Sequence, residues 1–367
     1  MRSPAEVRAP VLLIILAACG GATGPEPAGL THEAYVWQRA WTPAVSSAVA
    51  AAPTDVTGLR VLAIEVTGSA QVWPDVDVAA LARAGRPVTA VMRIDGSRLP
   101  EALTLGPLVE RLDGWRRAGV DVAGIEIDHD CATPALDGYA AWLEAVRPPA
   151  PLRFSITALP TWAATPSLRR VAAAVDELVV QVHAVRAPRI FDAGAARRWL
   201  ERFAAATPGA TLRVALPTYR IAVGGAVAEA NPAEVGGLLR SLQRSPIAGV
   251  GGVVWFRLPV AGDHAAWPPA TLAAVIRGAP LAPALAVRLV ARGAGQHDVV
   301  LENRGTIAAP FPALRIEGAL VAADLTGGYV AVTSDHRHWA GPPRAVAAGS
   351  SAVVGWATGE GLDVSAY

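Results

Sequence analysis

The stretch Val120–Cys131 reads V-D-V-A-G-I-E-I-D-H-D-C and decides the fold that we expect for the chain. Isoleucines alternate here with the acids Glu126, Asp128 and Asp130. Successive side chains of a β-strand point to opposite faces, so the three carboxylates share one face. Burying them is costly unless they are bonded. The pattern therefore predicts a strand that carries a functional site; the alternative is an edge strand with a solvated acidic face.

Eight strand-like segments alternate with helix-like segments along the chain. Asp75, Asp192 and the pairs Thr133-Pro134, Thr165-Pro166 and Asn231-Pro232 are typical helix starts. About 245 residues of this alternation predict an α/β fold, the (β/α)8 TIM barrel. A doubly wound open sheet is the alternative, but no glycine-rich phosphate fingerprint follows the first strand. The expected strands are Tyr35–Trp41, Arg60–Thr67, Val88–Asp95, Val122–Asp130, Leu152–Leu159, Leu178–His183, Leu212–Tyr219 and Gly251–Leu258.

Helical signals end near Pro280, and short alternating segments follow. They predict a small C-terminal antiparallel β-sandwich of about 85 residues. It could be a carbohydrate-binding accessory domain or a rigid cap on the barrel, and the sequence leaves both open. The expected strands are Leu285–Ala291, Asp298–Glu302, Ala313–Glu317, Tyr329–Thr333 and Ala352–Trp356.

The N-terminus has the features of a bacterial lipoprotein signal. Arginines precede a short apolar stretch that ends in L-A-A-C-G, with Cys19 as the residue to be lipidated. The alternative is an ordinary secretory signal with a chance cysteine. We expect a signal peptide over residues 1–19, a flexible tether over 20–31, a barrel over 32–279 and a sandwich over 280–367. The protein would be lipid-anchored in the cell envelope, on the periplasmic or extracellular face, at the outer membrane where the host has one.

Composition excludes several partners. The net charge of the 367 residues is +1, so we expect no nucleic-acid partner. After residue 20 no apolar run reaches the roughly 18 residues of a membrane span. We expect a monomer that uses no cofactor.

The polar residues of the expected barrel collect where its active site should lie. Active-site groups of TIM barrels lie at the carboxyl ends of the strands, and several strands end in acids, arginines or aromatics. Two carboxyl groups can serve glycoside hydrolysis as general acid and electrostatic partner. Tryptophans near strand ends, among them Trp37 and Trp255, could stack on sugar rings.

The sequence supports two other kinds of site, a metal site and a cysteine nucleophile, less well. Asp128, Asp130, His183 and Glu65 could surround a metal ion, but the spacing of a metal-binding motif is missing, and we expect no metal. Cys131 could be a nucleophile beside a histidine, but we interpret it as a packing residue.

Three segments carry a family resemblance. Gly124–Asp130 resembles the strand-four signature of family 18 glycoside hydrolases, the chitinase-like TIM barrels. Leu216–Arg220 is similar to a turn after their strand seven, and Gly252–Trp255 to the end of their strand eight. The whole chain is more similar still to a bacterial lipoprotein family, domain of unknown function 3142. This resemblance implies a chitinase-like barrel and a glycan or oligosaccharide as ligand.

The departures from the family 18 signature concern the catalytic residues. Asp130 stands where that family has a glutamate proton donor, and its reach is shorter by roughly 1.5 Å, while misplacement of about 1 Å can cost ~10²-fold in rate. Arg93 and Asp95 replace the small residues of strand three, and His129 replaces an aromatic residue.

The resemblance assigns these residues possible roles in a hydrolase. Asp130 would be the acid/base, Asp128 its orienting and pKa-raising neighbour, and Glu126 a deeper support paired with Arg93. The expected substrate-binding residues are Trp37, Arg93, Asp95, Gln181, His183, Tyr219 and Trp255. Three hypotheses remain: a glycoside hydrolase-like enzyme, a non-catalytic glycan-binding barrel, and a purely structural envelope lipoprotein.

Overall fold

The computed structural model describes residues 29–100, 103–186, 189–223 and 226–367. Cys19, the signal peptide and most of the expected tether lie outside these residues. Within the described segments, no helix is long and apolar enough to cross a membrane.

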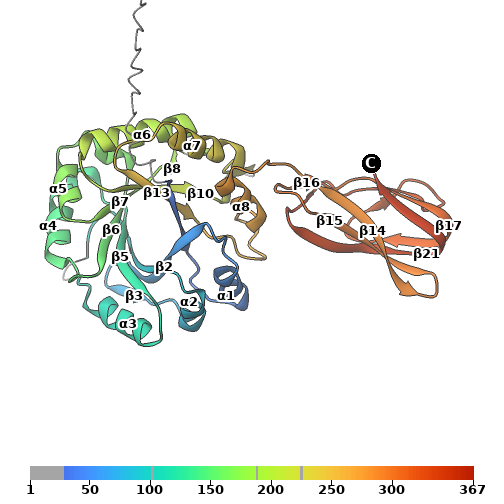
Figure 1. The fold of residues 1–367 in the computed structure, drawn as a ribbon, viewed down its shortest axis with the longest axis horizontal. Helices are drawn as coiled ribbons and strands as arrows, with labels where there is room; N and C mark the ends of the chain where they lie inside the picture. The colour runs from blue at the N-terminus through green and yellow to red at the C-terminus, as the bar shows by residue number, and fades with distance from the viewer. Residues whose placement is uncertain (1–28, 101–102, 187–188, 224–225) are drawn as a thin grey trace, which may run out of the picture.

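Eight parallel strands form a closed barrel inside a ring of helices (Figure 1). The barrel closes because β1 pairs with both β13 and β2. This confirms the predicted TIM barrel. Its strands are β1 (Thr31–Val36), β2 (Val56–Thr67), β4 (Val88–Asp95), β5 (Val122–His129), β6 (Arg153–Ala158), β7 (Glu177–Gln181), β10 (Leu212–Pro217) and β13 (Val250–Phe256).

The helices begin where the local sequence supplies a cap or a proline. Asp77 accepts from the backbone N–H of Ala80, Asp192 from that of Ala195, and Asn231 from two N–H groups of the next turn. The helices are α1 (Pro43–Ala50), α2 (Val78–Ala84), α3 (Gly106–Arg117), α4 (Leu136–Val146), α5 (Ser167–Ala173), α6 (Ala193–Ala206), α7 (Pro232–Arg244) and α8 (Pro269–Arg277), with 3-10 turns η1 (Thr133–Ala135) and η2 (Pro160–Ala164).

Several predicted boundaries were wrong. The first strand ends at Val36, not Trp41, so Trp37 begins the loop after it. Helix α2 is capped by Asp77 rather than Asp75. Three additions were missed: β3 (Ala70–Val72), the hairpin β8–β9 (His183–Arg186 and Arg189–Phe191) and the hairpin β11–β12 (Arg220–Val223 and Ala226–Glu229).

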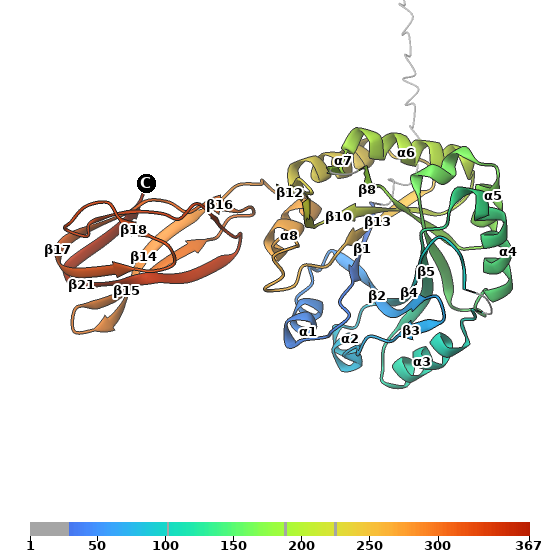
Figure 2. The same ribbon diagram turned by 180° about the vertical axis from the view of Figure 1, so that it is seen from behind.

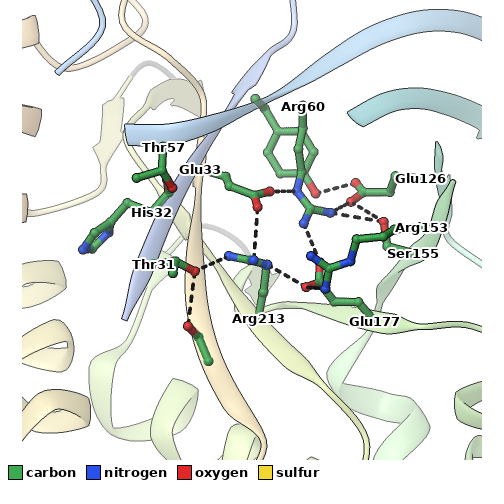
Figure 3. Close-up of polar contacts among 12 residues, drawn as sticks. Thr31, His32, Glu33, Thr57, Arg60, Glu126, Arg153, Ser155, Glu177 and Arg213 are labelled. Carbon is green, nitrogen blue, oxygen red and sulfur yellow. Dashed lines mark hydrogen bonds and ion pairs between the residues drawn. The ribbon is translucent and has the colours of Figure 1, made fainter. Parts of the chain in front are cut away.

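The amino-terminal end of the barrel is filled by a buried ion network (Figure 3). Arg60 binds Glu33 at 2.6 Å and Glu177 at 2.5 Å, and it also pairs with Glu126. Arg213 binds Glu177 at 2.7 Å and Glu33 at 3.1 Å. A cavity of about 260 Å³ borders this network. Every charged group named here has a partner of opposite sign, so the network crosslinks five strands of the barrel.

The C-terminal region is antiparallel β structure (Figure 2), as predicted. A six-stranded sheet has the order β14-β15-β21-β17-β19-β18, and a two-stranded sheet pairs β16 with β20. Buried side chains such as Val299, Leu301 and Trp339 form its own core. The bounds are β14 (Leu285–Gly293), β15 (Gln296–Asn303), β16 (Ala309–Pro310), β17 (Leu314–Leu325), β18 (Val330–Ala331), β19 (His338–Ala340), β20 (Ala345–Val346) and β21 (Ser350–Ala366).

Candidate functional site

Strand β5 lies between β4 and β6, so the alternative of a solvated edge strand is wrong. Glu126 and Asp128 of β5 share the interior face of the barrel with Asp130, which lies one residue beyond the end of the strand, as the alternation predicted. Their partners show, however, that the acids lie at different depths along the barrel axis. Glu126 belongs to the buried network, whereas Asp128 and Asp130 contact Arg93 nearer the carboxyl end.

Glu126 is a structural residue in this arrangement. It is fully buried, accepts a 2.6 Å hydrogen bond from the hydroxyl of Tyr35, and pairs with Arg60. Burial raises the pKa of its carboxyl, and the charge of Arg60 opposes that shift. The predicted pairing with Arg93 is wrong, because Glu126 pairs with Arg60, whereas Arg93 is the register partner of Asp128 on the neighbouring strand.

Arg93 is the centre of the carboxyl-terminal site. Its Nε donates to Asp95 at 3.0 Å, Nη1 to Asp128 at 3.0 Å and Nη2 to Asp130 at 2.8 Å. The hydrogen bond from Arg93 is the main cause of the lowered pKa of Asp95. One guanidinium thus holds three of the predicted site carboxylates together at the mouth of the barrel.

Both carboxylate oxygens of Asp128 already accept a hydrogen bond. Its Oδ1 accepts a 2.6 Å hydrogen bond from Thr157 and its Oδ2 accepts from Arg93. No hydrogen bond joins Asp128 to Asp130 within the described part of the chain. Burial raises the pKa of Asp128, although Arg93 opposes the shift. Asp130 remains half-exposed, with 44% of its side chain accessible.

Aromatic rings cover the barrel interior beside these acids. Trp37 is half-buried and packs edge-on against Tyr35 and Phe256. His183 is buried, stacks on Phe256, and lies 3.2 Å from the hydroxyl of Tyr219. Burial lowers the pKa of His183 to about 3, so its imidazole is neutral near pH 7.

Two predicted substrate-binding residues remain, and only Gln181 lies at this end of the barrel interior. Gln181 is half-buried and donates to the carbonyl of His183, inside the same end of the barrel. Trp255 is wrong as a ligand contact, because it is fully buried on the outer face of β13, where it stacks on His32 and donates to its Nδ1. The two neighbours of Trp255 in sequence, Val254 and Phe256, face the interior instead.

Sequence reasoning missed a group of polar atoms in the segments that follow β1 and β13. These are both amide atoms of Gln38, Nε1 of Trp41 and Nε of Arg257, all buried and lacking a hydrogen-bond partner among the described residues. Buried polar groups are normally bonded, so such atoms need water or a ligand. The only signal in the sequence was their place just after the first and last barrel strands.

The alternatives to carboxylate chemistry find no support. Cys131 is buried in the main core and burial raises the pKa of its thiol to about 11, which agrees with a packing residue. The described segments contain no group of three or more histidine, cysteine, aspartate or glutamate side chains suited to a metal ion.

Comparison with known proteins finds one family model that matches part of the chain. Residues 84–261 match the family described as "Domain of unknown function (DUF3142)". The matched segment runs from the end of α2 past β13 and includes Arg93, Glu126, Asp128 and Asp130. No curated protein matches the chain.

Solved structures of similar fold include family 18 barrels. The spore cortex-lytic enzyme SleL of Bacillus cereus is 11% identical over 64% of this chain and 72% of its own, with a TM-score of 0.47. The chitinase ChiB of Flavobacterium johnsoniae is 11% identical over 68% and 94%, with a TM-score of 0.45. The xylanase and α-amylase inhibitor protein XAIP-II of Scadoxus multiflorus is 14% identical over 69% and 100%, with a TM-score of 0.47. These likenesses concern the fold alone.

Proposed function

We propose that this protein, whose barrel carries a DUF3142 domain, binds a glycan at the carboxyl-terminal mouth without hydrolysing it. The observation that carries the proposal is the position of Arg93. Its guanidinium donates to both Asp128 and Asp130, and no hydrogen bond joins the two acids among the described residues, so neither carboxyl is arranged as a proton donor with an orienting carboxylate.

The mouth offers the groups that a sugar ring needs. The half-buried indole of Trp37 supplies an apolar surface, and the half-exposed carboxylate of Asp130 can accept hydrogen bonds from hydroxyl groups. The unpartnered atoms of Gln38 and Arg257 add donors and an acceptor close to the end of β1. Aromatic surface with a few convergent polar groups is typical of small-ligand sites.

The experiment measures binding and product release in parallel for the full-length protein with a panel of labelled glycans, including chitin and peptidoglycan fragments. We expect binding without turnover. Trp37→Ala should weaken binding about tenfold or more, because buried aromatic contacts dominate interface energies. Trp199→Ala is the matched control: this tryptophan is also half-buried but lies on the outer helix α6, and its loss should leave binding unchanged.

A hydrolase is the second candidate, and the raised pKa of Asp128 favours it, since a carboxyl of displaced pKa beside a second carboxyl, here Asp130, is a feature of acid–base sites. It predicts turnover that disappears in Asp130→Asn. Such a result would contradict the binding proposal and would assign Asp130 the role of acid/base.

We also propose that Cys19 carries a lipid that anchors the chain in the cell envelope, on the basis of the L-A-A-C-G sequence. In Cys19→Ser we expect loss of metabolic palmitate labelling and a shift of the protein from the membrane to the soluble fraction. Cys131→Ser is the control, because that thiol is buried in the folded core. Unchanged fractionation of Cys19→Ser would contradict the anchor.

A further inference from the structure

The outer face of the C-terminal sheet carries an exposed tryptophan. Trp356 lies on β21, a central strand of the six-stranded sheet, and 43% of it is accessible. Both of its direct neighbours in sequence, Gly355 and Ala357, are buried, and Ala357 belongs to the core of the domain. The indole therefore stands on the face of the sheet that the core does not use.

Cross-strand partners place carboxylates on both sides of this indole. Trp356 pairs with Asp298 of β15 and with Asp324 of β17. Directly paired residues of an antiparallel sheet have their side chains on the same face, with Cβ atoms about 4.5–5.5 Å apart. Arg292 pairs with Oδ2 of Asp298, whereas Asp324 makes no ion pair within the described residues.

The next set of cross-strand neighbours on the same face has small or polar side chains. Thr358 lies two residues along β21 and pairs with Gln296 of β15 and Ala322 of β17. Gln296 is exposed, and the methyl side chain of Ala322 leaves room beside the indole. The face thus combines one flat aromatic ring with carboxylate, amide and hydroxyl groups around it.

We propose that this face, defined by Trp356, Asp298, Asp324, Thr358 and Gln296, is a second glycan-binding site. The indole would stack on the apolar face of a sugar ring, and the flanking carboxylates and amide would bind its hydroxyl groups. No bond is made or broken in this step. The site is separate from the barrel mouth and does not rest on the function proposed there.

The flanking charges favour a sugar over an apolar protein surface. A protein that covered the indole would also have to desolvate Asp324, which is costly unless its carboxylate gains a partner, whereas Asp298 already has one in Arg292. A sugar ring carries hydroxyl donors around an apolar face, so it can bind Asp324 while it covers the indole. A polar, partly solvated rim of this kind suits a ligand of low apolar content.

The test measures retention of the full-length protein on insoluble chitin, cellulose and peptidoglycan. It uses Trp37→Ala as the parent, so that loss of the barrel site cannot be mistaken for loss of this one. We expect the parent to be retained on at least one polysaccharide, and the additional change Trp356→Ala to reduce its affinity about tenfold or more. Trp356→Tyr should restore most of the retention, because an aromatic ring remains.

Val321→Ala is the matched control, because Val321 is an even more exposed apolar side chain on the neighbouring strand β17, and its loss should leave retention unchanged. Equal retention of the parent and its Trp356→Ala derivative would overturn the proposal. So would a parent that binds none of the three polysaccharides.

Discussion

Arg60→Met is expected to lower the free energy of unfolding of the barrel by about 3–5 kcal/mol, because it removes one partner of a buried ion network. The guanidinium of Arg60 is the cation shared by Glu33, Glu126 and Glu177, and only 3% of its side chain is accessible. Methionine keeps most of the side-chain volume, so the change tests charge more than packing. Glu126, fully buried, would keep only Tyr35 and Ser155 as partners.

Urea unfolding at neutral pH, followed by circular dichroism, measures this effect. The matched control is Arg170→Met, which also removes an arginine from a glutamate pair, but the Arg170–Glu144 pair is solvent-exposed. Exposed ion pairs contribute little to stability, so this variant should unfold like the parent. The double change Arg60→Met, Glu126→Gln should recover part of the lost stability, since it removes the carboxylate left without its cation. Equal stability of Arg60→Met and Arg170→Met would mean that the network does not stabilise the barrel.

The barrel architecture could be predicted from the sequence because the signals for its strands and helices are local. Each barrel strand is a short apolar segment, and capping residues or prolines mark the helices that follow, so all eight strands could be located before the structure. Boundaries failed where tertiary contacts decide them. Trp37 continues an apolar pattern, yet β1 ends before it, because the last residue of β1 that still pairs with β2 is Val36.

The site was predicted in part. Alternation along Val122–Asp130 correctly placed three acids on the interior face, but it could not supply their partners, which come from other strands. Arg60 lies on β2 and Arg93 on β4, and only the folded barrel shows which arginine meets which acid. Trp255 illustrates the same limit: it lies at a strand end, but a shift of one residue moves a side chain to the other face.

His183→Gln is expected to make the protein less sensitive to acid by about 2 kcal/mol between pH 7.5 and pH 5. In the unfolded chain a histidine titrates near pH 6.5, whereas burial lowers the pKa of His183 to about 3 in the folded state. Between these values the unfolded chain binds a proton that the folded chain does not. The contribution of His183 to stability is therefore fully present above pH 6.5 and declines as the pH falls toward 3.

The measurement compares unfolding free energies at pH 7.5 and pH 5 for the parent, for His183→Gln, and for His264→Gln as a control with an exposed side chain. Burial raises the pKa values of Glu126 and Asp128, so these acids favour folding as the pH falls, but they do so in every variant and cancel in the comparison. The His264→Gln protein should follow the parent. An equal loss of stability in the parent and in His183→Gln would mean that the folded barrel accepts a proton on His183. The rings of Phe256 and Tyr219 would then leave the imidazole open to water, and the mouth would carry more positive charge at pH 5 than at pH 7.5.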